Sequence, residues 1–177
     1  MIEPTRVSSR AEQLRSAFDR ARAIPFSSET AEQIENLLAI RVSGDAFAIR
    51  LSEVSGLATN KKIVALPSPI PELLGVAGIR GRLVPVYSLA ALLGYSANAD
   101  QGRWLALCGA EEPVGLVIND FEGHLRVPLA QVYKAEQKDM TSTHVTHVVR
   151  ASDMVRAVVS IPQLVEIIRT RCRGAGE

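Results

Sequence analysis

Few residues in this chain have side chains suited to catalysis or metal binding. The three histidines are His124, His144 and His147, and the two cysteines are Cys108 and Cys172. In a strand, residues 144 and 147 point to opposite faces, so the last two histidines would not share a metal. The chain contains no H-x-E, H-E-x-x-H or C-x-x-C pattern, the usual signatures of zinc sites. We therefore expect no metal site, no cofactor and reduced thiols.

Nucleophilic and acid–base chemistry has as little support. The motif G-x-S-x-G is absent from the sequence, and no serine has an obvious base partner. Asp120 and Glu122 lie near each other, but two acidic residues in a turn are usually just solvated. We predict that the protein is not an enzyme and has no catalytic residues.

The most unusual stretch is GVAGIRGRLVPV, residues 75–86, in which Gly75, Gly78 and Gly81 recur at every third position. Their spacing fits neither a dinucleotide-binding fingerprint nor a P-loop. Such glycines indicate a tight turn or positive φ angles. A turn of this kind could hold Arg80 where its guanidinium meets a partner protein. A solvated charge beside a hairpin turn explains the same residue equally well.

Composition limits the class of partner. Twenty basic and 19 acidic residues leave a formal net charge of +1, and only 5% of the residues are aromatic. Both values disfavour a nucleic-acid-binding surface, which needs clustered positive charge or stacking platforms. No stretch approaches the roughly 20 apolar residues of a membrane-spanning helix, and the N-terminus does not resemble a signal peptide. We expect a soluble, cytoplasmic protein without membrane insertion.

Hydrophobic periodicity predicts a mainly β protein with a few helices. A helix is predicted at Ser9–Arg22, where Ser9 and Glu12 have capping-box spacing. Ser88 is expected to cap a short helix that ends at Gly94, and Ser160 a final one. Pro85 places its strand at an edge or a bulge. The predicted strands cover residues 37–42, 46–51, 63–66, 83–87, 104–108, 114–118, 144–149 and 154–159.

The order of these elements repeats in the two halves of the chain. Residues 37–49 and 104–117 both read as strand, polar turn and strand, and residues 83–93 and 157–168 as strand, serine cap and short helix. The repeat indicates a duplicated small β-barrel unit rather than one continuous sheet. Chance similarity among short β-runs is the alternative.

The segment GVAGIRGRLVPVYSLAALLG, residues 75–94, resembles the signature of the CheW family of bacterial chemosensory scaffold proteins. Residues 37–57 resemble the opening hairpin of that family, and residues 114–128 resemble a hairpin of its second half. The likeness covers about residues 32–171. The positions that match the central signature are Gly75, Val76, Arg80, Gly81, Val84, Pro85, Val86 and Leu89.

The resemblance implies two SH3-like, five-stranded β-barrel subdomains, to which the sequence adds an N-terminal and a C-terminal helix. It divides the chain into an extension (1–31), a CheW-like domain (32–171) and a flexible tail (172–177). The implied role is a non-enzymatic adaptor without a cofactor. One subdomain would bind the regulatory domain of a CheA-type histidine kinase, and the groove between the subdomains would take the cytoplasmic tip of a chemoreceptor.

Carried over by position, the resemblance implies two contact regions. The receptor-facing residues would be Val76, Ile79 and Arg80, and the kinase-facing residues Val54, Gly56 and Leu57. Two positions depart from the family pattern, because Gly78 stands where the family has asparagine and Ser88 where it has aspartate. Gly75, Gly78, Gly81 and Ser88 are expected to form the structural turn and cap.

The N-terminal extension and Gly78 leave a second interpretation open. The chain could be a divergent adaptor that binds only one of the two partners in a non-flagellar motility pathway or another chemosensory-like pathway. In either case we expect it in the cytoplasm at membrane-associated receptor arrays. A small β-barrel enzyme and a nucleic-acid-binding barrel are the rival classes, and the observations above count against both.

Overall fold

The computed structural model describes residues 33–96, 102–109, 112–135, 144–151 and 154–174. The chain divides into two units, Met1–Glu32 and Gln33–Glu177, and all of the described residues belong to the second. The helix predicted for Ser9–Arg22 therefore lies outside the described residues.

The described residues are mainly β, as the periodicity predicts. The helical elements are η1 (Leu51–Glu53), α2 (Leu89–Leu92), η3 (Leu129–Gln131) and α3 (Ile161–Gly174). The strands are β1 (Ile34–Val42), β2 (Asp45–Arg50), β3 (Val54–Thr59), β4 (Ile63–Val64), β5 (Leu73–Ile79), β6 (Arg82–Ser88), β7 (Trp104–Cys108), β8 (Val114–Ile118), β9 (Asp120–Pro128), β10 (Val132–Lys134), β11 (Val145–Ala151) and β12 (Met154–Val159).

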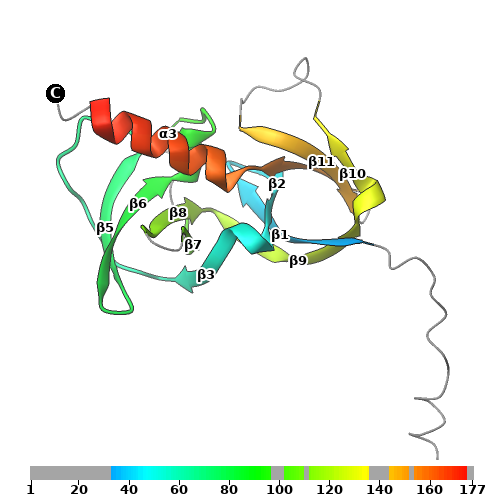
Figure 1. The fold of residues 1–177 in the computed structure, drawn as a ribbon. Helices are drawn as coiled ribbons and strands as arrows, with labels where there is room; N and C mark the ends of the chain where they lie inside the picture. Colours follow the sequence, from blue (N-terminus) through cyan, green and yellow to red (C-terminus); the bar gives the residue numbers. More distant parts are fainter. Residues whose placement is uncertain (1–32, 97–101, 110–111, 136–143, 152–153, 175–177) are drawn as a thin grey trace, which may run out of the picture. The chain divides into compact units, whose positions relative to one another are not determined.

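These strands form two sheets of six strands each (Figure 1). Sheet A has the order β10-β11-β12-β2-β1-β9, and sheet B has the order β3-β7-β8-β6-β5-β4. The structure therefore differs from the two five-stranded subdomains that the resemblance implied. Each sheet includes a very short edge strand, β4 with 2 residues or β10 with 3, and runs this short carry little periodicity.

The two sheets have the same arrangement of strands, and each sheet contains a hairpin from the other half of the chain. Read from β4 to β3, sheet B has β4, β5, β6, β8, β7 and β3 where sheet A has β10, β11, β12, β2, β1 and β9. The hairpin β1–β2 of the first half thus completes the sheet of the second half, and β7–β8 completes the other. The duplication read from the sequence is present, but each half contributes strands to both sheets.

A parallel pairing joins each exchanged hairpin to its sheet. In sheet A, Ala48 of β2 pairs with Val158 of β12, and in sheet B, Gly115 of β8 pairs with Val86 of β6. Val86 and Val158 are equivalent in the repeat, because each lies two residues before the serine that precedes the helix of its half. The equivalent pairings show that the two halves share their register as well as their element order.

The buried side chains of the described residues form three clusters. One lies within each sheet, and a larger one is shared by both sheets, α2 and α3. Because side chains alternate between the two faces of a strand, neighbouring residues belong to different clusters. Val158 belongs to the cluster of sheet A, while Val159 belongs to the shared one. The shared cluster joins the sheets through apolar burial, the dominant stabilising term in folding.

Helix α3 lies across this shared cluster (Figure 1). Its buried residues Ile161, Leu164 and Ile168 are spaced by three and four, as on one face of a helix. The helix continues to Gly174, three residues beyond the domain boundary expected at Arg171. No helix in the described part of the chain is long and apolar enough to span a membrane.

Pro85 lies in β6, an inner strand of sheet B. Strand β6 pairs with β8 only from Val86 onward, whereas Pro85 pairs with Val76 of β5. The proline therefore occupies the part of β6 that has a neighbour on one side. This local edge explains how a residue without an N–H group fits an inner strand.

Candidate protein-interaction surface

Arg80 lies in the two-residue turn that joins β5 to β6. Its φ is 50°, and that of Gly81 is 77°, so both central residues have the positive φ angles of a type I′ turn. Glycine adopts this conformation freely, whereas a residue with a Cβ does so at a cost of roughly 1 kcal/mol. Arg80 is exposed, so its side chain is held on the surface by a strained turn.

The side chain of Arg80 extends over strand β3. A Cβ at position 56 would lie 3.7 Å from Arg80 Nη2 and 3.8 Å from Leu107 Cδ1. The guanidinium of Arg80 therefore lies beside Gly56, although the two residues lie on opposite flanks of sheet B. The residues expected to face the receptor and those expected to face the kinase meet at this point.

Strand β3 is an edge strand of sheet B, so one side of its backbone is open to a partner. Val54 and Leu57 are half-buried against the shared cluster, and Ser55 between them is exposed. The Ser55 hydroxyl donates a hydrogen bond to the Leu107 carbonyl over 3.0 Å. The predicted kinase-facing residues thus lie on an accessible edge strand. The side chains of two of them, Val54 and Leu57, also pack against the core.

Of the predicted receptor-facing residues, Ile79 is buried. Its side chain is only 6% exposed, and it belongs to the cluster within sheet B, so it supports the turn from inside. Val76 is half-buried and lies beside the exposed Val64, its partner on β4. Val76 and Val64 share a face because opposite residues of a ladder do.

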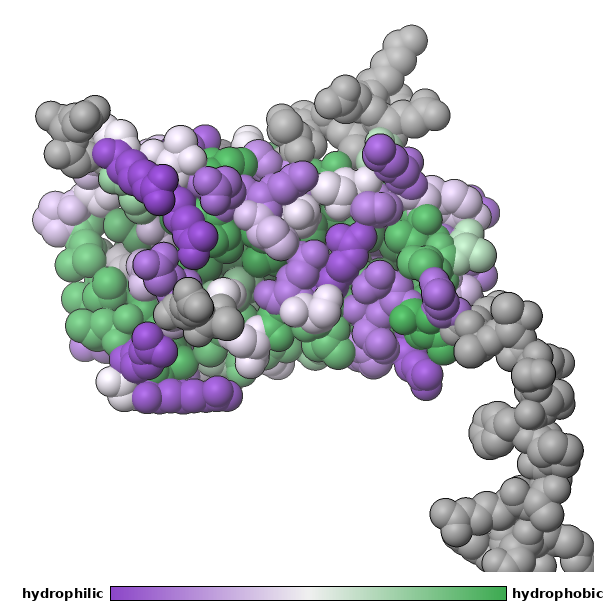
Figure 2. Space-filling view, viewed as in Figure 1, coloured by the Kyte–Doolittle hydropathy of each residue, from purple (hydrophilic) through white to green (hydrophobic). Residues whose placement is uncertain are grey.

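The same face of sheet B carries Leu83, which is 77% exposed. Figure 2 shows hydrophobic side chains gathered over the part of the molecule that contains β5 and β6. The equivalent positions of sheet A hold Tyr133, Val148 and Val155, and two of these, Tyr133 and Val155, are exposed. Sequence reasoning missed this apolar surface, which the outward alternation of LVPVY at residues 83–87 could have indicated.

The glycines of the motif have different structural roles. At Gly75, φ is +141°, and a Cβ would lie 2.0 Å from the Val64 carbonyl oxygen. Position 75 therefore requires glycine, beside an irregularity in the β5–β6 register. Gly78 has open space around it and pairs with Leu83 within the strands, so it is not part of the turn. Gly81 alone of the three forms the turn with Arg80.

Ser88 is the N-cap of α2, the role that the sequence predicts. Its backbone is extended, and its Oγ accepts a hydrogen bond from the Ala91 N–H over 2.9 Å. The helix then ends within one turn, with Gly94 at φ +90°. Ser160, the corresponding residue before α3, accepts from the Leu164 N–H with its backbone carbonyl over 3.2 Å.

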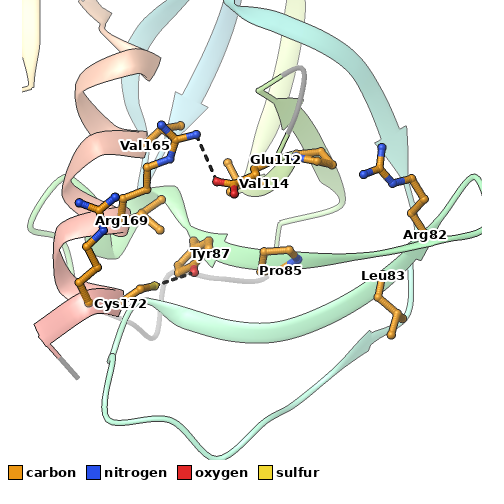
Figure 3. Close-up of a pocket in the computed structure, with 12 residues that line it drawn as sticks. Arg82, Leu83, Pro85, Tyr87, Glu112, Val114, Val165, Arg169 and Cys172 are labelled. Atoms are coloured by element: carbon orange, nitrogen blue, oxygen red, sulfur yellow. Dashed lines mark hydrogen bonds and ion pairs between the residues drawn. The ribbon is translucent and has the colours of Figure 1, made fainter. Parts of the chain in front are cut away.

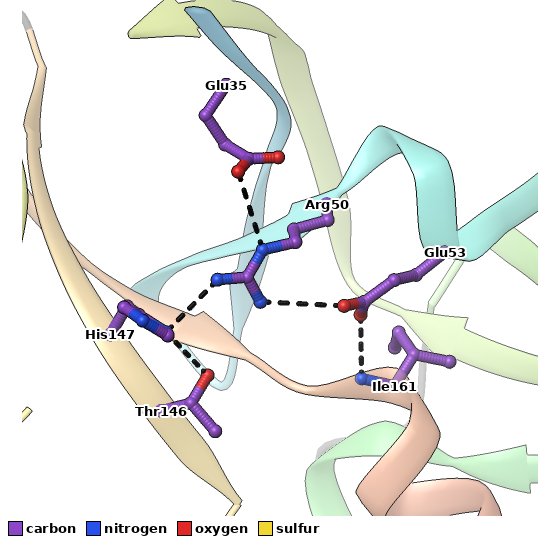
Figure 4. Close-up of polar contacts among 6 residues, drawn as sticks. All are labelled: Glu35, Arg50, Glu53, Thr146, His147 and Ile161. Carbon is purple, nitrogen blue, oxygen red and sulfur yellow. Dashed lines mark hydrogen bonds and ion pairs between the residues drawn. The ribbon is translucent and has the colours of Figure 1, made fainter. Parts of the chain in front are cut away.

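A polar network connects sheet A to the start of α3 (Figure 4). Arg50 Nε lies 3.7 Å from Glu35, and Arg50 Nη1 lies 3.5 Å from Glu53. Arg50 Nη2 lies 3.0 Å from Nδ1 of His147. Burial and then the charge of Arg50 lower the pKa of His147 and so favour its neutral form. Glu53 in turn accepts from the Ile161 N–H over 2.9 Å.

Glu122 is exposed, as expected, but it belongs to strand β9 and not to a turn. Its carboxylate lies 2.7 Å from Arg41 Nε and 2.6 Å from Arg156 Nη1. Burial opposes its ionisation, but the hydrogen bonds from the two arginines outweigh that effect and lower the pKa of Glu122. These ion pairs tie β1, β9 and β12 of sheet A together.

The described residues contain no group of three or more His, Cys, Asp and Glu side chains placed to hold a metal ion. Cys108 is buried in β7. Burial, with a smaller effect from the charge of Glu53, raises the pKa of its thiol to about 12. A thiol that stays protonated is a poor nucleophile, and Cys108 therefore acts as a core residue.

Comparison with known proteins places these features in context. The model of the CheW-like domain family matches residues 36–169. The fold is similar to the crystal structure of the scaffolding protein TtCheW from Thermoanaerobacter tengcongensis, with a TM-score of 0.68 and 12% sequence identity. That likeness covers 76% of this chain and 94% of TtCheW. No curated protein matches the sequence.

Proposed function

The chain belongs to the CheW-like domain family, and we propose that it is a non-enzymatic adaptor that couples chemoreceptors to a CheA-type histidine kinase. The similar structure is that of a scaffolding protein, which supports a role in holding other proteins together. In this proposal the chain works in the cytoplasm, at membrane-associated receptor arrays.

The observation that carries the proposal is the position of Arg80. A strained, non-glycine residue at an exposed turn is costly to folding, and such strain gathers at functional sites. The guanidinium is planar and carries five donors, so it suits recognition of carboxylates and backbone carbonyls on a partner. Its placement over Gly56 of the edge strand β3 would put these donors beside an open strand edge.

We assign the two partners to adjoining parts of this surface. Arg80 and Val76 would contact the receptor tip, and Val54, Gly56 and Leu57 would contact the kinase regulatory domain. Ile79 supports the receptor contact only indirectly, because it is buried.

Each contact would be modest, with a buried area of about 1,600 Å² or less and a Kd on the order of 1 μM. Within an array, one bound partner raises the effective concentration of the next, so avidity could add about 100-fold. The signal would pass as a change in the populations of kinase arrangements.

The alternative is a divergent adaptor that binds only one of the two partners. It is favoured by the same proximity of Arg80 to Gly56, because two partners that each cover this point would exclude each other. Gly78, which replaces the asparagine expected from the family resemblance, also favours it, since the position offers no side-chain amide.

Calorimetric titration separates the two proposals. A kinase regulatory domain and a chemoreceptor cytoplasmic fragment are first titrated separately into the chain. Each partner is then titrated into the complex that the chain forms with the other partner. The adaptor proposal predicts binding of both partners and a ternary complex, whereas the alternative predicts binding of one. Binding of each partner alone without a ternary complex would show mutual exclusion and would contradict the adaptor proposal. Binding of neither partner would contradict both.

Ser55→Arg is a suitable variant for the kinase contact. Ser55 is exposed on the edge strand, so the bulky, charged side chain should block a partner without disturbing the core. Leu57→Asp is less informative because Leu57 is half-buried against the shared cluster. We expect Ser55→Arg to weaken kinase binding and to leave the circular dichroism spectrum unchanged.

A further inference from the structure

We propose that a groove beside helix α3 binds an acidic segment of a partner protein that also carries apolar side chains. The groove has a volume of about 710 Å³ and lies between α3, strand β6 and the residues Glu112 and Pro113 that precede β8 (Figure 3). It contains none of the residues assigned above to the receptor or the kinase. The inference therefore goes beyond the proposed function.

The floor of the groove is apolar and only partly covered. Along β6, Tyr87 is 4% exposed beneath α3, Pro85 is half-buried, and Leu83 is 77% exposed. These alternate residues share one face of the strand, so the helix covers one end of an apolar stripe and leaves the other end open. Val114 and Val165 add further apolar surface. Contiguous exposed apolar surface that is rimmed by polar residues marks interaction sites.

The rim of the groove is positively charged. Arg82 on β6 and Arg169 and Arg173 on α3 line it, against one acidic residue, Glu112. Arg169 lies 3.3 Å from Glu112. Among the ion pairs formed within the described residues, neither Arg82 nor Arg173 takes part.

Two of these arginines are therefore available to an acidic partner, and complementary charge favours specific association. The favourable effect of a basic residue at a helix C-terminus accounts for Arg173 but not for Arg82, which comes from a strand. Arg82 and Arg173 line the same groove from different elements.

The chain's own N-terminal segment has no net negative charge to complement the rim. Residues 1–32 contain five arginines and five acidic residues. A single nucleic-acid strand would need exposed aromatic rings for stacking, and Tyr87 is buried. The apolar floor and basic rim together fit an acidic protein segment with leucine-like side chains.

The test begins with a random peptide library displayed on phage and selected on the full chain. Selected peptides are synthesised, labelled and titrated by fluorescence anisotropy against the wild type and two groove variants. Leu83→Ser removes the exposed apolar side chain, and the double variant Arg82→Glu with Arg173→Glu reverses the rim charge. Arg126→Glu, at an exposed arginine of β9, is the matched control for charge alone.

We expect the selected peptides to be enriched in Asp and Glu beside apolar residues. Both groove variants should weaken their binding by at least about tenfold, while Arg126→Glu should change it by less than about twofold. A selection without acidic enrichment, or one that yields no peptide, would overturn the proposal. So would equal binding to the groove variants, or a labelled oligonucleotide whose binding depends on the same two arginines.

Discussion

The carboxylate of Glu53 accepts a hydrogen bond from the backbone N–H of Ile161, 108 residues further along the chain. Glu53 follows the exchanged hairpin β1–β2, and Ile161 is the first residue of α3. The free N–H groups at a helix start need acceptors, and a negative charge there also favours the helix dipole. One side chain thus links the end of the hairpin to the helix that covers the shared core.

Replacement of Glu53 should therefore destabilise the fold. Glu53→Ala removes the acceptor for Ile161 and a partner of Arg50, and we expect a loss of about 1–2 kcal/mol in the free energy of unfolding. Glu53→Gln keeps an acceptor and should show only part of that loss. Urea denaturation measures both, with Glu166→Ala on the exposed side of α3 as the control. Equal stability of Glu53→Ala and the wild type would show that the hydrogen bond has no structural role.

The two glycines of β5 should respond differently to the same substitution. Gly75→Ala places a Cβ 2.0 Å from the Val64 carbonyl at a positive φ, so we expect a loss of more than about 2 kcal/mol or a failure to fold. Gly78→Ala meets open space and should lie within about 0.5 kcal/mol of the wild type. Thermal unfolding of the two variants gives the comparison. Similar destabilisation by both would contradict the roles assigned to these glycines.

Acidification should weaken the fold through His147 and His144. Burial lowers the pKa of both rings below 6.5, with Arg50 contributing at His147 and Arg171 at His144. The unfolded chain then binds a proton at higher pH than the folded chain, so stability is full above pH about 6.5 and falls below it. The groups that face His147 are Arg50, Glu35, Lys134 and Thr146.

Denaturation at a series of pH values measures this effect. His147→Gln should flatten the decrease below pH about 6.5, and the double variant with His144→Gln should flatten it further. The lowered pKa of Glu122 acts in a separate, more acidic range, below its usual 4.5. A double histidine variant with the same pH dependence as the wild type would exclude these rings as its source.

Local chemistry explains what the sequence revealed about the fold. Ser88 caps α2 because a serine before a short apolar run satisfies the free N–H groups through its own hydroxyl. The hairpins β1–β2 and β7–β8 follow from period-two alternation on either side of polar turns. The prediction that Pro85 places its strand at an edge or a bulge is wrong, because β6 is an inner strand, although its part at Pro85 has only one neighbouring strand.

Local chemistry could not predict which sheet each hairpin belongs to. The alternation of Ala46–Leu51 is equally compatible with pairing to either half of the chain. The hairpin β1–β2 belongs to sheet A because of long-range strand pairing, such as that of Ala48 with Val158, which local alternation does not reveal. The burial of Ile79 was missed for a similar reason, because a motif resemblance does not tell which side of a strand faces the core. The proximity of Arg80 to Gly56 also joins residues that are distant in sequence, so local patterns could not predict it.

The most direct test of the proposed adaptor function is receptor binding by Arg80→Glu. A chemoreceptor cytoplasmic fragment is titrated into the wild type, Arg80→Glu and the control Arg126→Glu, with circular dichroism recorded for each. Because Arg80 is exposed, the substitution should leave the spectrum intact and weaken binding by at least about tenfold, with Arg126→Glu close to the wild type. Unchanged affinity in a folded Arg80→Glu protein would contradict the proposed role of this turn.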